Sequence, residues 1–225
     1  MQDKIQLSNN VNAIPENSML GLVIRNIDPD RNQRHTGFIY LKNELPKLAH
    51  FGWKDHFIYQ DYKPDYAFSW LNFLPERTAL PIIAELELLA KQNPFFAPYG
   101  IVNKGGTKFE NGALIKNPMI EGDSLTCSVF VLCLLEQFGF YIINRESWEI
   151  TNEDTIWQNN ILNKLEGALS PEYMKIQREN IGLVKRFRPE QIVGACCIFE
   201  FEPVEYNDAC EAAKIILQRL DSLQC

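Results

Sequence analysis

Cys127 offers the most chemistry of any residue in the chain, because it begins the apolar run Cys127–Phe138 (CSVFVLCLLEQF). The run predicts a helix that ends at Gly139, and its apolar residues on nearly every side predict burial against the sheet. A thiol at a helix N-terminus lies near free backbone N–H groups and the positive end of the helix dipole. Both favour the nucleophilic thiolate. The alternative is a small apolar residue that enters a core helix, as we expect for Cys133.

The histidines are candidates for the proton acceptor that such a thiol needs. There are three, His35, His50 and His56. His35 begins one predicted strand and His50 lies in the next, so antiparallel pairing can bring the two imidazoles together. One would accept the thiol proton and the other would fix its tautomer. The alternative is that His35 is a solvated strand-end residue and His50 a core residue; we interpret His56 as a surface residue.

Several segments carry a family resemblance. His35–Leu41 (HTGFIYL) followed by Leu48–His50 resembles the two-strand element with two histidines of NlpC-type papain-fold enzymes. Pro98–Gly100, Gly105-Gly106 and Thr126–Ser128 are similar to the segment of that family in which a tyrosine and two glycines precede the nucleophile. The resemblance implies that Cys127 is the nucleophile, His35 the base and His50 its orienting partner. It also implies that Tyr99 contacts the substrate.

The order of these segments resembles one branch of that superfamily. The histidines precede the cysteine, which is the circularly permuted order of the lecithin:retinol acyltransferase-like proteins. Thr126–Val131 (TCSVFV) is similar in position to the segment that opens the nucleophile helix in that branch. It departs from the pattern at Thr126, which replaces Asp or Asn, and at Ser128-Val129, which replaces Glu-His. The resemblance covers about residues 20–139.

The remaining elements follow from hydrophobic periodicity and turn residues. Strands are predicted at Leu20–Ile27, His35–Leu41, Lys47–Trp53, Tyr66–Phe73 and Tyr141–Asn144. Helices are predicted at Arg77–Gln92, Cys127–Phe138, Asn152–Glu166, Ser170–Glu179, Pro189–Cys196 and Asp208–Leu223, and a long loop at Pro94–Asp123.

These elements predict an α+β fold with a small antiparallel sheet and the Cys127 helix packed on it. The expected permuted papain-like core covers residues 19–145. Residues 146–225 are expected to form a helical extension that packs on this core as part of one structural unit. The apolar faces of its helices must be buried, and the core offers the nearest apolar surface.

Composition excludes several classes of function. The 225 residues hold 22 Lys and Arg against 29 Asp and Glu, a net charge of −7, which argues against a nucleic-acid partner. No apolar stretch approaches the ~20 residues that cross a bilayer, and no signal peptide is evident, so we expect a cytoplasmic protein. The six cysteines include no Cys-x-x-Cys pair, so neither zinc nor a disulfide framework is indicated. We expect no metal and no organic cofactor.

The function that these residues predict is a thiol-dependent hydrolase, an amidase or peptidase. It would cleave an amide or ester in a peptide, a peptidoglycan fragment or an acyl lipid. Two alternatives stay open at this point. One is the lipid acyltransferase or phospholipase chemistry of the permuted branch, and the other is a catalytically silent binding module whose histidines are structural.

Overall fold

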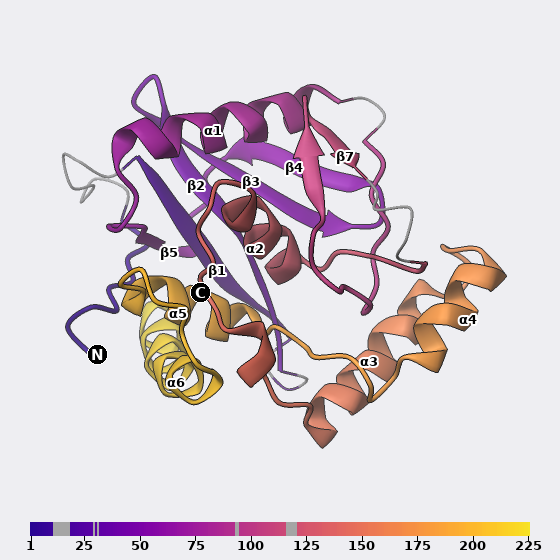
Figure 1. Ribbon diagram of the computed structural model, residues 1–225. Helices are drawn as coiled ribbons and strands as arrows, with labels where there is room; N and C mark the ends of the chain where they lie inside the picture. The colour runs from indigo at the N-terminus through magenta and orange to yellow at the C-terminus, as the bar shows by residue number, and fades with distance from the viewer. Residues whose placement is uncertain (11–18, 29, 31, 93–94, 116–120) are drawn as a thin grey trace.

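Five antiparallel strands form the main sheet, in the order β4-β3-β2-β1-β5. The computed structural model describes residues 1–10, 19–28, 30, 32–92, 95–115 and 121–225. Strands β1 to β4 form a meander, and β5 pairs with the other side of β1 (Figure 1). The bounds are β1 Leu20–Asp28, β2 Gln33–Lys42, β3 Leu45–Trp53, β4 His56–Asp61 and β5 Ala67–Trp70.

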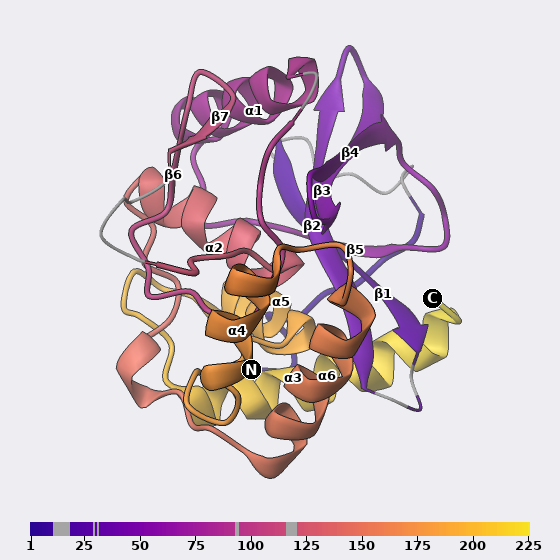
Figure 2. The same cartoon turned by 90° about the vertical axis from the view of Figure 1, so that its right-hand side faces the viewer.

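Helices cover the sheet and extend beyond one end of it (Figures 1 and 2). They are α1 Glu76–Lys91, α2 Cys127–Gln137, α3 Asn152–Leu165, α4 Pro171–Glu179, α5 Pro189–Ile198 and α6 Tyr206–Leu223. A short 3-10 turn, η3, spans Arg145–Ser147, and a two-stranded hairpin is formed by β6 Lys108–Glu110 and β7 Ala113–Ile115. Within the described residues, no helix is both long and apolar enough to span a membrane.

Buried apolar side chains lie on both faces of the sheet. Successive side chains of a strand point to opposite sides, so neighbouring residues belong to different clusters. Leu22 and Ile24 of β1 belong to the large core that contains α2. Val23, which lies between them, packs with Ile39 and Leu48 in a smaller cluster on the opposite face. The strands that carry the two candidate histidines are therefore held on both sides by apolar packing.

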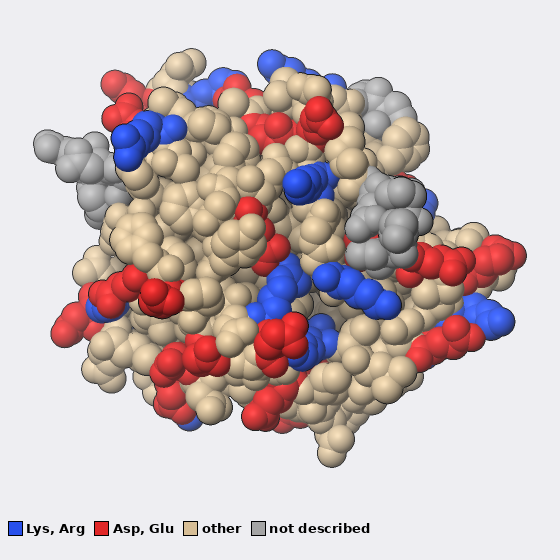
Figure 3. Space-filling model, in the orientation of Figure 1, with Lys and Arg blue, Asp and Glu red and all other residues tan. Residues whose placement is uncertain are grey.

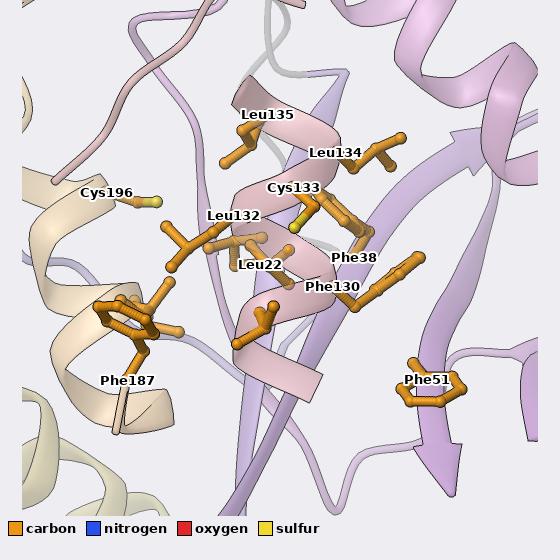
Figure 4. Close-up of a cluster of buried hydrophobic side chains, with 14 of the residues drawn as sticks. Leu22, Phe38, Phe51, Phe130, Leu132, Cys133, Leu134, Leu135, Phe187 and Cys196 are labelled. Atoms are coloured by element: carbon orange, nitrogen blue, oxygen red, sulfur yellow. The ribbon is translucent and has the colours of Figure 1, made fainter. Parts of the chain in front are cut away.

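Helix α2 occupies the centre of the large core. Every residue from Cys127 to Leu135 is buried. Figure 4 shows Phe38 of β2 on one side of the helix and Cys196 of α5 on the other. The helix begins where the Thr126 hydroxyl accepts a hydrogen bond from the Val129 N–H, at 3.3 Å. This cap fixes the first turn, and with it the position of Cys127.

The region after residue 145 packs on this core. Helix α5 lies against α2, β1 and β2, and its apolar residues belong to the same cluster as those of α2. Helices α5 and α6 approach each other closely at Gly194, where a Cβ atom would lie 2.8 Å from the Cβ of Ala212. Figure 2 shows α3 to α6 beside one end of α2 and of β1.

The structure confirms the predicted α+β class, the antiparallel sheet and the packing of the Cys127 helix on it. The predicted strand Tyr141–Asn144 is wrong: it makes only an isolated bridge between Ile143 and Val204. Strand β4 was not predicted, and neither was the β6–β7 hairpin, which lies inside the predicted loop Pro94–Asp123. Residues 94 and 116–120 of that loop lie outside the described residues.

We expect a chain that ends at Asn144 to lose cooperative folding, because the cut exposes the side of α2 that faces α5. Leu132 and Leu135 are fully buried there, and full burial of one such side chain contributes about 2–3 kcal/mol. Exposing several of them removes much of the ~5–15 kcal/mol that stabilises a typical domain. Thermal unfolding of the shortened and full-length chains, followed by circular dichroism, checks this. A cooperative transition at an unchanged Tm would contradict it.

Candidate functional site

A cavity of about 240 Å³ opens at the N-terminus of α2. Its walls contain all four residues that the sequence singled out: Cys127, His35, His50 and Tyr99. They come from α2, β2, β3 and the loop before α2, so only the folded chain brings them together. His56 is exposed, as predicted for a surface residue, and it also lines this cavity.

The two histidines are in direct contact. His35 Nε2 lies 2.6 Å from His50 Nδ1, and the ring planes are inclined by 72°. Gly37 makes this contact possible, because a Cβ atom at that position would lie only 2.4 Å from the Cβ of His50. Tyr66 lies against both rings, with centroids 6.4 Å from His35 and 6.0 Å from His50. The pair is thus fixed by packing as well as by its hydrogen bond.

Cys127 lies near the histidines, at the end of β2 where its pairing with β3 stops. Pairing of β2 with β3 extends no further towards the histidines than Phe38 and Ala49, so His50 lies just beyond the paired segment. The backbone of Thr36, the residue after His35, lies close enough to Cys127 to lower the pKa of its thiol. The start of α2 therefore meets β2 next to His35.

Burial keeps both imidazoles neutral. The pKa of His35 is lowered to about 3, chiefly by burial and further by the charges of His50 and Arg25. The pKa of His50 is lowered to about 4, again chiefly by burial, with contributions from Arg25, His56 and Lys63. A neutral imidazole has one unprotonated nitrogen, so His35 can accept a proton at neutral pH.

The thiol of Cys127 is also held neutral, contrary to the expectation from its position at a helix N-terminus. Burial raises its pKa above the usual thiol value. Hydrogen bonds from Thr36 and Ser128 and the charge of Arg186 favour the thiolate, but they offset this burial only in part. In the resting protein the pair is therefore a thiol and an imidazole rather than a thiolate and an imidazolium.

No hydrogen bond joins the Cys127 sulfur to His35 among the described residues, although both line the cavity. Catalytic hydrogen bonds are often long in a protein without substrate and shorten when substrate binds. The arrangement places a thiol and a neutral imidazole in one cavity, and direct proton transfer between them would require a movement that brings the two side chains together.

Tyr99 forms part of the wall next to Cys127. Its ring lies 4.9 Å from that of Trp53 and 5.6 Å from that of Phe51, measured between centroids. A backbone bridge to Leu125 places the Tyr99 segment beside the strand-like residues that lead into α2. Burial raises the pKa of Tyr99, so its hydroxyl stays protonated and can donate a hydrogen bond.

Gln177 of α4 holds the loop that precedes Cys127. This fully buried amide accepts hydrogen bonds from the N–H groups of Ile101 and Val102, at 2.8 and 3.2 Å. Its Nε2 donates to the Gly122 carbonyl, at 2.6 Å. One side chain from the region after residue 145 therefore connects the early and late parts of the loop.

Sequence reasoning missed the basic residues of the cavity wall. They are Arg25, Arg34, Lys185 and Arg186. The last two come from the extension, which also contributes Trp157 to the wall. No motif surrounds these residues in the sequence. Arg25 and Arg34 lie on β1 and β2, whereas Lys185 and Arg186 lie between α4 and α5 and reach the cavity only because the extension packs on the core.

The described residues contain no group of three or more His, Cys, Asp or Glu side chains arranged to hold a metal ion. Comparisons of this chain with protein-family models, with curated proteins and with solved structures found no match.

The raised pKa of Cys127 leads to a pH prediction. A group with a raised pKa ionises only at higher pH, so alkylation of Cys127 by iodoacetamide should keep increasing up to pH 9 and beyond. Mass spectrometry of tryptic peptides measures the rate at each pH, and the urea-unfolded chain supplies the reference for an unperturbed thiol. A plateau below pH 8.5 would instead mean that the helix N-terminus outweighs burial.

A second prediction concerns Gly37. Gly37→Ala should displace His50 and break its contact with His35, because the added methyl group overlaps the His50 Cβ. The imidazole NMR signals of both histidines should shift, and unfolding should cost about 1–3 kcal/mol less. Gly167→Ala is the control: it strains the backbone at φ 80° but meets no atom within 4 Å. If both variants leave the imidazole signals unchanged, the contact does not depend on Gly37.

Proposed function

We propose that the chain is a thiol-dependent hydrolase that cleaves an amide or ester through an acyl-enzyme. One observation carries the proposal: Cys127 lines the same cavity as a hydrogen-bonded pair of neutral histidines. The order of His35, His50 and Cys127, and the resemblance to permuted NlpC-type enzymes, support the same chemistry.

In the first step Cys127 Sγ attacks the carbonyl carbon as its proton moves to His35. Since Nε2 of His35 contacts His50, Nδ1 is the nitrogen left to accept that proton. The proton moves while the S–C bond forms, because a neutral thiol is a poor nucleophile. The backbone N–H of Cys127, at the start of α2, can donate to the developing oxyanion.

In the second step the imidazolium of His35 donates its proton to the leaving nitrogen or oxygen, and the bond from that atom to the carbonyl carbon breaks. A thioester on Cys127 remains. Water then attacks the thioester, with His35 again accepting a proton, and Sγ leaves and recovers its proton. The low pKa of His35 makes it a weak base but an efficient proton donor to the leaving group.

His50 acts by fixing the tautomer of His35. For His35 to accept a proton at Nδ1, its Nε2 must carry a hydrogen and donate it to His50 Nδ1. His50 then carries its own hydrogen on Nε2, which is buried and has no hydrogen-bond partner among the described residues. An amide oxygen can replace the accepting nitrogen, so His50→Gln should retain part of the function.

The silent binding module is the second candidate, and two observations favour it. Cys127 makes no hydrogen bond to His35 in the described part of the chain, and burial raises the pKa of its thiol. Under this alternative the cavity binds a ligand without cleaving it, and the histidines serve packing alone.

Hydrolysis of p-nitrophenyl acetate tests the proposal, with the acyl-enzyme trapped by acid and detected by mass spectrometry. Cys127→Ser should reduce turnover by about 10³-fold or more and abolish the adduct, and His35→Gln should reduce turnover by about 10²–10⁴-fold. His50→Gln should cost less than His35→Gln. Cys210→Ser, a half-buried thiol outside the cavity wall, is the matched control. Equal turnover in all four variants would favour the binding module.

A further inference from the structure

The charges of the cavity wall differ from those of the chain as a whole. The described residues around the cavity number 22 and include four Lys or Arg and no Asp or Glu. With 29 acidic residues in 225, about three would be expected in a set of this size. On the face that Figure 3 shows, acidic and basic side chains both occur.

Arg186 is a basic residue of the wall whose charge Asp154 and Glu190 neutralise only in part. Its Nη1 lies 3.5 Å from Asp154 Oδ1, and the same oxygen accepts a closer hydrogen bond, at 2.9 Å, from Arg188. The other carboxylate oxygen of Asp154 accepts from Thr151. Arg186 is 7% exposed, so this positive charge has little water to stabilise it.

The guanidinium of Arg186 is nevertheless rigidly placed. Its Cζ lies 4.0 Å from the centroid of the Trp157 ring, and its Nη2 donates to the Asn32 carbonyl, at 3.1 Å. Its charge also acts on Cys127, whose thiolate it favours. A fixed guanidinium at a cavity wall is the arrangement that binds carboxylates and phosphates in proteins.

Arg34 offers a second incompletely paired guanidinium. It meets Glu190 through a single contact of 3.3 Å, and its side chain is 9% exposed. Its Nε is buried without a hydrogen-bond partner among the described residues. Such an atom costs free energy until a ligand or water satisfies it.

The other two basic residues of the wall have more partners. Arg25 pairs with Asp65 and lies over the ring of Tyr66, although its Nε, like that of Arg34, has no hydrogen-bond partner among the described residues. Lys185 donates to the carbonyls of Arg145 and Glu146.

We propose that the substrate carries an oxyanion, a carboxylate or phosphate, near the carbonyl that Cys127 attacks, and that Arg186 and Arg34 bind it. This inference rests on the proposed function for the position of the carbonyl. The anion site itself follows from the charges and contacts of the wall.

Two alkylating reagents of similar size test the site, because iodoacetate carries a carboxylate and iodoacetamide does not. The ratio of their rates at Cys127, iodoacetate over iodoacetamide, is compared with the ratio in the urea-unfolded chain. We expect it to be about tenfold higher in the folded protein, since a nearby cation attracts the anionic reagent. Arg186→Gln should abolish most of this preference. Lys214→Gln, which removes an exposed charge on α6 outside the wall, should leave it unchanged.

Competition distinguishes the two kinds of anion and needs no variant. Inorganic phosphate and glutarate are each added at an ionic strength matched with sodium chloride, and the slowing of iodoacetamide alkylation is measured. Stronger protection by glutarate would assign a carboxylate, and stronger protection by phosphate a phosphate. If Arg186→Gln does not fold, Arg34→Gln takes its place in the rate comparison.

The outcomes separate the two proposals. A ratio equal to that of the unfolded chain, with no protection by either anion, would overturn the anion site and leave Cys127 as a nucleophile. If neither reagent modifies Cys127, the proposed hydrolase fails, and thermal unfolding then decides the anion site alone. In that case a Tm raised by glutarate or phosphate in the unmodified chain but not in Arg186→Gln supports the site, and an unchanged Tm overturns it.

Discussion

The structure depends on the need to enclose α2 on all sides. A helix with nine consecutive buried residues cannot lie on the surface of a sheet, as an amphipathic helix does. One side of α2 meets β2 and β3, and the other requires a further apolar layer, which α5 supplies. The fold is therefore a sheet, a central helix and an outer helical layer, and the outer layer is part of the core.

The same constraint produces the cavity. The outer layer packs on α2, and the first turn of the helix, where Cys127 lies, faces a cavity lined by β2, β3 and the start of α5. The Cys127 thiol and both imidazoles are themselves largely buried in its wall, which explains why they stay neutral. Burial thus sets the charge state of the three side chains, and the proposed hydrolase would have to transfer a proton while the new bond forms.

Much of the fold could be predicted from local sequence patterns. Alternation and helical spacing located β1, β2, β3 and every helix to within a few residues, because those segments have strong periodicity. The strand at Tyr141–Asn144 was wrong because its apolar residues, Ile142 and Ile143, are buried without a strand partner beyond a single bridge. The hairpin from Lys108 to Ile115 was missed because three-residue strands give almost no pattern.

The candidate site was predictable to a lesser degree. The contact between His35 and His50 was predictable, because their strands follow one another in the sequence and a short connection makes such strands pair. The protonation state of Cys127 was not predictable. Its place at a helix N-terminus can be inferred from the local sequence, but its burial, which raises the pKa of the thiol, depends on distant segments. Arg186 illustrates the same limit: it is far from the histidines in the sequence and reaches the cavity only through the packing of the extension.

The buried amide of Gln177 has a consequence for the order in which the protein is made. The loop that it connects precedes α2, whereas the amide itself lies on α4, much later in the chain. During synthesis from the N-terminus, Cys127 leaves the ribosome before Gln177, the residue that holds the loop leading to it, has been added to the chain. Until α4 and α5 have been synthesised, the apolar helix and its thiol lack the partners that bury them, so the cavity assembles late.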